Sequence, residues 1–139
     1  MLSQKIINEE DIGNTKGDEV LSLTTIHEIV GKLGKEEILE ILKNYVEGNI
    51  NKIEENVSLV DLTAFLLWLE GILEPLNIYV TGVFPFPDVE TGEILFIGVE
   101  LKGCNSRDVW SSLSRFVKGE MREEGFKDLA GEIGLICHQ

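Results

Sequence analysis

The hydrophobic positions in the first half of the chain follow the spacing of an α-helix. The clearest example is residues 35–47, where apolar side chains recur every three or four positions: Ile38, Ile41, Leu42, Tyr45 and Val46. Glu36 and Glu37 stand in the first turn, where the helix dipole favours negative charge. Gly48 follows the last apolar position, so the pattern predicts a helix over residues 35–47.

Two flanking segments carry weaker helical signals. Residues 19–33 combine β-branched side chains, which suit a strand, with apolar positions that suit a helix face. Helix is the preferred interpretation, with interruptions near Gly31 and Gly34. Residues 49–56 are a polar connector, for which the pattern predicts at most one helical turn.

Residues 59–73 predict a third helix that is apolar on nearly all sides. Ser58 is its expected N-cap, and Asp61 follows three residues later. A helix of this kind is either buried on all sides, which is the more common outcome, or turns one face towards another subunit. The second alternative makes three side chains candidates for an interface: Leu66, Leu67 and Leu69.

After Pro75 the period of the pattern changes from 3.6 residues to 2. Residues 78–84 and 94–101 are predicted strands. A hairpin connection joins them, and its Pro85 and Pro87 cannot donate to a β-ladder, so that end of the hairpin is expected to be either frayed or at an edge. The strand over 94–101 is nearly continuously apolar, as expected of a central strand with both faces covered.

The remaining elements complete the expected fold. Ser106 begins a fourth helix, which runs to about Glu124, and residues 133–137 form a short last strand. The prediction is a single α+β domain over residues 1–139, in which a mostly helical N-terminal half packs on a small C-terminal sheet with β-β-α-β order. Residues 1–18 are expected to be a polar lead-in that can be flexible.

The chain is strongly acidic. It has 25 Asp and Glu against 12 Lys and Arg, a formal net charge of −13 at pH 7. Nucleic acid and anionic membranes are therefore poor partners, and a basic protein surface is a favoured one. The start of the chain has no apolar stretch of signal-peptide length, and residues 59–73 are too short to span a bilayer. A cytoplasmic location is the expectation.

The strongest candidate for chemistry lies between the second strand and the fourth helix. A helix N-terminus offers unpaired N–H groups and partial positive charge, so it can hold an anion and favour a thiolate. The candidate ligand-binding residues are Gly103, Asn105, Ser106 and Arg107, and Cys104 is a weak candidate nucleophile. The simpler alternative is that Asn105 or Ser106 caps the helix and Cys104 is a small buried residue.

The chain contains four soft metal ligands: Cys104, Cys137, His27 and His138. Their number would suit a tetrahedral zinc site, but their spacing does not, so neither a metal nor a cofactor is predicted. A Cys104–Cys137 disulfide is possible if the two strands that these residues follow or end are parallel neighbours. Because a reducing cytoplasm disfavours that bond, two separate free thiols are the default expectation.

Phe84 and Phe86, within the sequence Phe-Pro-Phe-Pro, form the aromatic cluster expected nearest the surface. They can act as an exposed docking element, although folding back onto the edge of the sheet is the more common outcome for such a cluster. No Ser-His-Asp set, phosphate-binding loop or dinucleotide fingerprint is present. The preferred hypothesis is a non-enzymatic module that associates with itself or with a basic protein. The competing hypothesis is a small anion-binding or thiol-dependent enzyme that uses residues 104–107.

Overall fold

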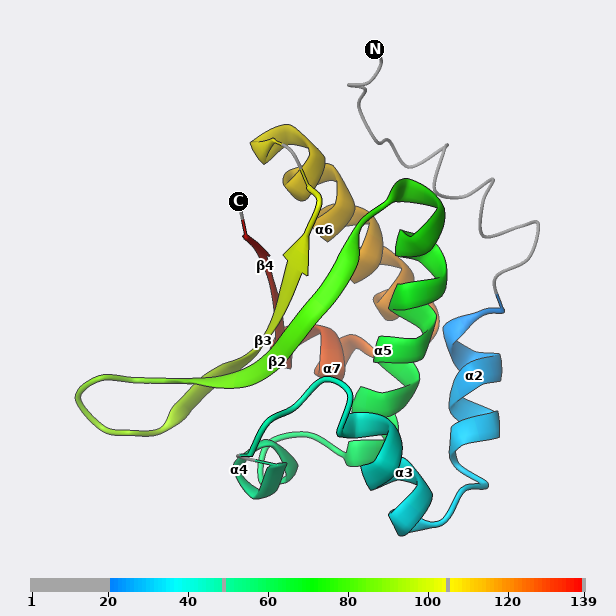
Figure 1. The fold of residues 1–139 in the computed structure, drawn as a ribbon, viewed down its shortest axis with the longest axis vertical. Coiled ribbons are helices and arrows are strands. Elements are labelled where there is room, and N and C mark those ends of the chain that lie inside the picture. Colours follow the sequence, from blue (N-terminus) through cyan, green and yellow to red (C-terminus); the bar gives the residue numbers. More distant parts are fainter. Residues whose placement is uncertain (1–20, 49, 105, 139) are drawn as a thin grey trace.

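The computed structural model describes residues 21–48, 50–104 and 106–138. Over these ranges the chain forms six α-helices and one three-stranded mixed sheet, with the helices first in sequence, which confirms the α+β prediction (Figure 1). The polar lead-in predicted over residues 1–18 lies outside the described residues, and so does Asn105.

The bounds of the elements agree with the sequence pattern to within a few residues in most places. In chain order the elements are α2 (Leu23–Val30), α3 (Lys35–Leu42), α4 (Ile50–Glu54), α5 (Leu59–Leu73), the 3₁₀ turn η1 (Glu74–Leu76), β2 (Tyr79–Pro87), β3 (Ile94–Lys102), α6 (Arg107–Glu123), α7 (Lys127–Glu132) and β4 (Ile133–His138).

The first two described helices confirm the helical interpretation and correct one length. Ser22 accepts a hydrogen bond from the Thr25 backbone N–H, which fixes the start of α2. Helix α3 is shorter than predicted and ends at Leu42. The following residues leave the helix and reach the sheet, where the Tyr45 carbonyl accepts from the Val83 N–H at 3.0 Å. That contact with β2 accounts for the end of the helix at Leu42, although the helical spacing of apolar residues continues to Val46.

Helix α5 is the centre of the hydrophobic core. Ser58 caps it through a bond from the Asp61 N–H, as predicted, and ten of its 15 residues are buried. Leu66 and Leu69 are 0% exposed within this one chain, so their assignment as interface residues is corrected to core packing. Leu67 is only partly buried. None of the helices in the described ranges has both the length and the apolar character needed to cross a bilayer.

The sheet has the strand order β2-β3-β4. Strand β3 is central, as its apolar sequence predicted; it pairs antiparallel with β2 and parallel with β4. The predicted β-β-α-β order is wrong in one respect. Both α6 and α7 lie between β3 and β4, so the order is β-β-α-α-β. Helix α7 escaped prediction because it has only six residues, contains Gly131 and buries only Leu129 and Ala130.

The helices pack on one face of the sheet (Figure 1). That face presents a row of buried aliphatic side chains to α5, α6 and α7: Val83, Ile97, Val99, Leu101, Ile133 and Leu135. Within the part of the chain that the structure describes, no helix covers the opposite face. The expectation that β3 is covered on both faces is therefore wrong for these residues, and its apolar sequence needs another explanation.

Candidate functional site

The uncovered side of the sheet carries a largely apolar surface that includes one carboxylate. Pairing places Phe84 opposite Gly98 and Phe86 opposite Phe96, and it continues to β4 with Glu100 opposite Ile136. Because side chains alternate along a strand, these residues share one side of the sheet. We call this surface the open face; its members are Phe84, Phe86, Phe96, Gly98, Glu100, Gly134 and Ile136.

The aromatic rings on the open face are packed together and lie close to the sheet. Ring centroids are 5.4 Å apart for Phe84 and Phe86 and 4.7 Å apart for Phe86 and Phe96. A Cβ atom added at Gly98 would come within 3.0 Å of the Phe84 ring, and one at Gly134 within 2.7 Å of the Phe96 ring. Glycine at these two positions therefore lets each ring lie down over the neighbouring strand. The result is a flattened apolar layer.

Beyond the open face, the β2–β3 hairpin reaches out from the body of the molecule (Figure 1). We call residues 87–94 the hairpin arm. Three large apolar side chains in or beside the arm are unusually exposed, at 40% for Phe86, 60% for Leu95 and 97% for Val89, whereas Ile94 is partly buried against the core. Exposed apolar groups gathered in one region are a mark of interaction sites, whereas scattered single ones are ordinary.

The turn of the hairpin arm is held by specific hydrogen bonds. Asp88 accepts from the Glu90 N–H at 2.7 Å through its carboxylate, and its own N–H donates to the Glu93 carbonyl at 2.7 Å. Gly92 has a φ of 77°, a conformation that favours glycine. The backbone of the arm is thus held in a defined turn, from which Val89 projects into solvent.

All charged side chains of β2, of the hairpin arm and of β3 before Lys102 are acidic. Between Lys52 and Lys102 the chain contains no Lys, Arg or His. The hairpin arm has three carboxylates, Asp88, Glu90 and Glu93, and Glu100 on the open face accepts a hydrogen bond from the Thr81 hydroxyl at 3.1 Å. The apolar layer is therefore bordered by negative charge beside the hairpin arm, whereas Lys102 and Arg107, which shares a pocket with Ile136, carry positive charge near its other end.

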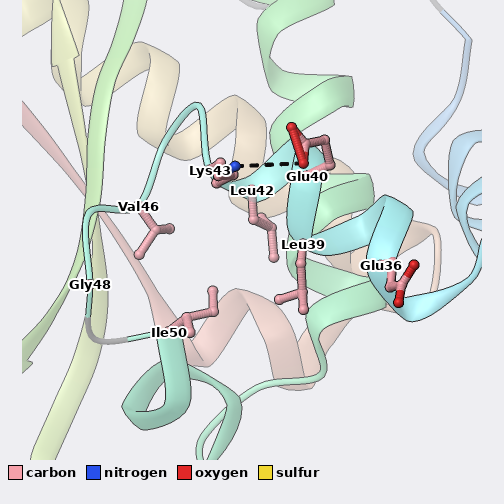
Figure 2. Close-up of a pocket in the computed structure, with 8 residues that line it drawn as sticks. All are labelled: Glu36, Leu39, Glu40, Leu42, Lys43, Val46, Gly48 and Ile50. Carbon is pink, nitrogen blue, oxygen red and sulfur yellow. Dashed lines mark ion pairs between the residues drawn. The ribbon is translucent and has the colours of Figure 1, made fainter.

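A concave surface lies between α3 and α4. Figure 2 shows Leu39, Leu42, Val46 and Ile50 converging on one space of about 550 Å³. Its rim includes Glu36 and a Glu40–Lys43 ion pair with an N–O distance of 3.7 Å. The lining side chains are aliphatic or exposed and charged, without a nucleophile or an imidazole. This pocket can accept an apolar group but has no evident catalytic chemistry.

The predicted strand-to-helix site also borders a pocket, of about 490 Å³. It is lined by Ser106, Arg107, Trp110, Leu135, Ile136 and Cys137. Ser106 is the N-cap of α6 and accepts from the Val109 N–H at 3.2 Å, which confirms the capping interpretation. Asp108 occupies the first turn of the same helix. Its negative charge opposes the field that would otherwise attract an anion.

Cys104 and Cys137 form a disulfide, with Cα atoms 6.1 Å apart. The default expectation of two free thiols is therefore wrong, and the parallel pairing of β3 with β4 supplies the reason. Leu101 lies opposite Cys137, which brings the residues just after β3 close to the end of β4. In this form Cys104, which is 2% exposed, has no thiol to act as a nucleophile. Gly103 has a φ of 108° and packs against Asn77, so its role is to make the turn.

Packing shifts the pKa of two ionisable side chains that lie outside these surfaces. Burial raises the pKa of the Tyr45 phenol well above its usual range. The Glu70 carboxylate adds to this effect, because it accepts a hydrogen bond from the phenol and is negatively charged. Burial, with the charge of Arg122, lowers the pKa of the Lys118 ammonium, which donates to the Ala130 and Ile133 carbonyls. Across the described ranges, no three His, Cys, Asp or Glu side chains cluster as a metal site would require.

Of the residues that the sequence singled out, the structure brings Phe84 and Phe86 together on one surface. Sequence reasoning missed Phe96 and Ile136, although the two-residue period of β3 and β4 carried the signal once the register was known. Comparison of the chain with protein-family models, with curated proteins and with solved structures finds no match.

Proposed function

We propose that this protein is a non-enzymatic interaction module that binds a protein partner through the open face and the hairpin arm. One observation carries the proposal: an aromatic and aliphatic layer lies uncovered by the described residues, while the opposite side of the same sheet is packed into the core. An apolar surface bordered by charge is typical of protein docking sites. A cytoplasmic location is also part of the proposal. Since a reducing cytoplasm disfavours the Cys104–Cys137 bond, this location requires a cytoplasm in which disulfides persist, as in hyperthermophiles.

The competing enzyme hypothesis rests on residues 104–107 and has less support. Its candidate nucleophile is held in a disulfide, and its serine hydroxyl is used to cap α6. Arg107 remains as a positive group at the pocket, but Asp108 beside it weakens any attraction for an anion. These contacts favour a structural role for the junction between β3 and α6.

Site-specific photo-crosslinking in cells tests the proposal. A benzoylphenylalanine replaces Phe86 in one variant and Ile29 in a control variant, since both side chains are about equally exposed, at 40% and 50%. We expect a discrete protein adduct from position 86, absent from position 29 and lost when Phe96→Ser is added to the position-86 variant. Equal adducts at both positions, or none at position 86, would overturn the proposal.

A further inference from the structure

We infer that the partner presents a basic amphipathic α-helix, which lies across the open face with its apolar side on the phenylalanine rings. This inference rests on the proposed function and specifies the partner's chemistry. Three features carry it: both edges of the sheet are partly blocked to an added strand, the open face has the width of one helix, and its border beside the hairpin arm is acidic.

The edge of β2 offers few donors to a new strand. The Val83 N–H, which points away from β3, is already bonded to the Tyr45 carbonyl at 3.0 Å. Pro85 and Pro87, farther along the same strand, have no N–H to donate. A partner that extends the sheet beside β2 would therefore lose the ladder bonds on which strand addition depends.

The edge of β4 is closed by side chains from α6. Trp110 donates its indole N–H to the Leu135 carbonyl at 2.9 Å, and the Lys118 ammonium donates to the Ile133 carbonyl. These two carbonyls would otherwise be the acceptors for a fourth strand. Because both edges are partly blocked, we expect a partner to pack against the face of the sheet and not to extend it. In α+β proteins a helix is the element that covers a sheet face.

The dimensions of the open face match a single helix. Neighbouring strands lie about 4.8 Å apart, so three strands span about 10 Å, and a helix with its side chains is about 10–12 Å wide. From Phe96 to Glu100 the face extends about 13 Å, a little more than two helical turns. The helix would place its apolar stripe over Phe84, Phe96 and Ile136.

Charge distinguishes a basic partner from a second copy of this chain. In a two-fold dimer the open face would pack on a second open face, so two surfaces that each carry Glu100 and the carboxylates of the hairpin arm would be brought together. Each copy also carries a net charge of −13. Lys and Arg on the flanks of a partner helix would instead meet Glu90 and Glu93 and speed association.

Isothermal titration with synthetic peptides of about 18 residues tests the inference. The probe is a helical peptide with a leucine stripe and lysine flanks. Its controls are a scrambled peptide of the same composition and a peptide with glutamate in place of lysine. Protein variants are Phe86→Ser on the open face, the pair Glu90→Gln and Glu93→Gln at its border, and Ile29→Ser as a distant control of similar exposure.

Of the three peptides, we expect only the amphipathic lysine peptide to bind the native protein. Its affinity for the Phe86→Ser variant should be about thirtyfold weaker, and its affinity for the Ile29→Ser variant should be unchanged. The variant with both Glu90→Gln and Glu93→Gln should bind this peptide more weakly than the native protein at low salt, and its affinity should fall less than that of the native protein as salt is added. Equal binding of the scrambled peptide would overturn the inference, because it would show attraction by charge alone.

Light scattering on the same samples separates failure of the inference from failure of the proposed function. A dimer that Phe86→Ser dissociates, with no binding of the lysine peptide, would overturn the helix inference and leave the interaction module standing. A monomer that binds no peptide and gives no adduct at position 86 would overturn both.

Discussion

The ring of Phe96 on β3 lies over Gly134 on β4, at a position where an added Cβ atom would come within 2.7 Å of the ring. The same relationship recurs one strand away, between Phe84 and Gly98. Two glycines thus set the height of the aromatic layer, and the flatness of the open face depends on them.

Gly134→Ala should destabilise the protein by about 1–3 kcal/mol, because the new methyl group forces the Phe96 ring off its site. Gly119→Ala on α6 is the matched control: nothing lies within 4 Å of its added Cβ atom, and alanine favours a helix by about 1 kcal/mol. Urea unfolding measures both. The explanation is wrong if both substitutions raise stability, or if adding Phe96→Leu fails to recover part of the loss at Gly134.

Leu69→Glu should prevent folding, since the side chain is fully buried in α5 and a carboxylate there has no partner. Ile29→Glu on α2 replaces a side chain that is 50% exposed and should leave the fold intact. Circular dichroism and size-exclusion chromatography distinguish the two. A folded Leu69→Glu protein would return α5 to consideration as an interface.

Thr63→Val should stabilise the protein by about 1 kcal/mol. The Thr63 hydroxyl is buried in α5 without a hydrogen-bond partner among the described residues, and valine has the same shape without the desolvated oxygen. Thr24→Val, at an exposed position of α2, should change little. Loss of stability in Thr63→Val would mean that the hydroxyl has a partner in solution, such as a buried water.

Tyr45→Phe should alter the dependence of stability on alkaline pH. The phenol has a raised pKa in the folded protein, because of burial and Glu70, so its contribution is fully present below the unfolded pKa of about 10. Above that pH the unfolded chain releases the proton first, and the contribution is lost as pH rises. The stability advantage of the native protein over Tyr45→Phe should therefore shrink above about pH 10. A constant advantage up to pH 11 would contradict this account; Tyr79→Phe is the control.

Replacing both Cys104 and Cys137 with alanine should lower the free energy of unfolding by about 3–4 kcal/mol, because the bond joins residues 33 positions apart and restricts the unfolded chain. The double variant should be insensitive to a thiol reductant, whereas the native protein should lose stability when reduced. Equal unfolding midpoints with and without reductant in the native protein would show that the disulfide adds little.

The sequence was sufficient to predict most elements of the fold, because apolar spacing reports the face that each segment buries. It predicted Ser58 and Ser106 as caps and the change from helix to strand after Pro75. It failed where local pattern and tertiary contact disagree. Helix α3 ends early because Tyr45 bonds to β2, and α7 is too short to show a period.

The candidate site was predictable only in part for the same reason. Phe84 and Phe86 are two positions apart in the sequence and could be recognised there. Phe96 and Ile136 join them only through the register of three strands, which no local pattern reveals. The Cys104–Cys137 bond likewise depends on parallel pairing between strands whose connection is two helices long.

The most direct test of the docking surface is an NMR titration that follows the Ile136 methyl and the Phe84, Phe86 and Phe96 ring signals as the amphipathic lysine peptide is added. Our account predicts that the large shifts fall on these residues and on the hairpin arm, with Leu39 and Ile50 in the α3–α4 pocket unchanged. Shifts centred on Leu39 and Ile50, or spread evenly over the molecule, would contradict it.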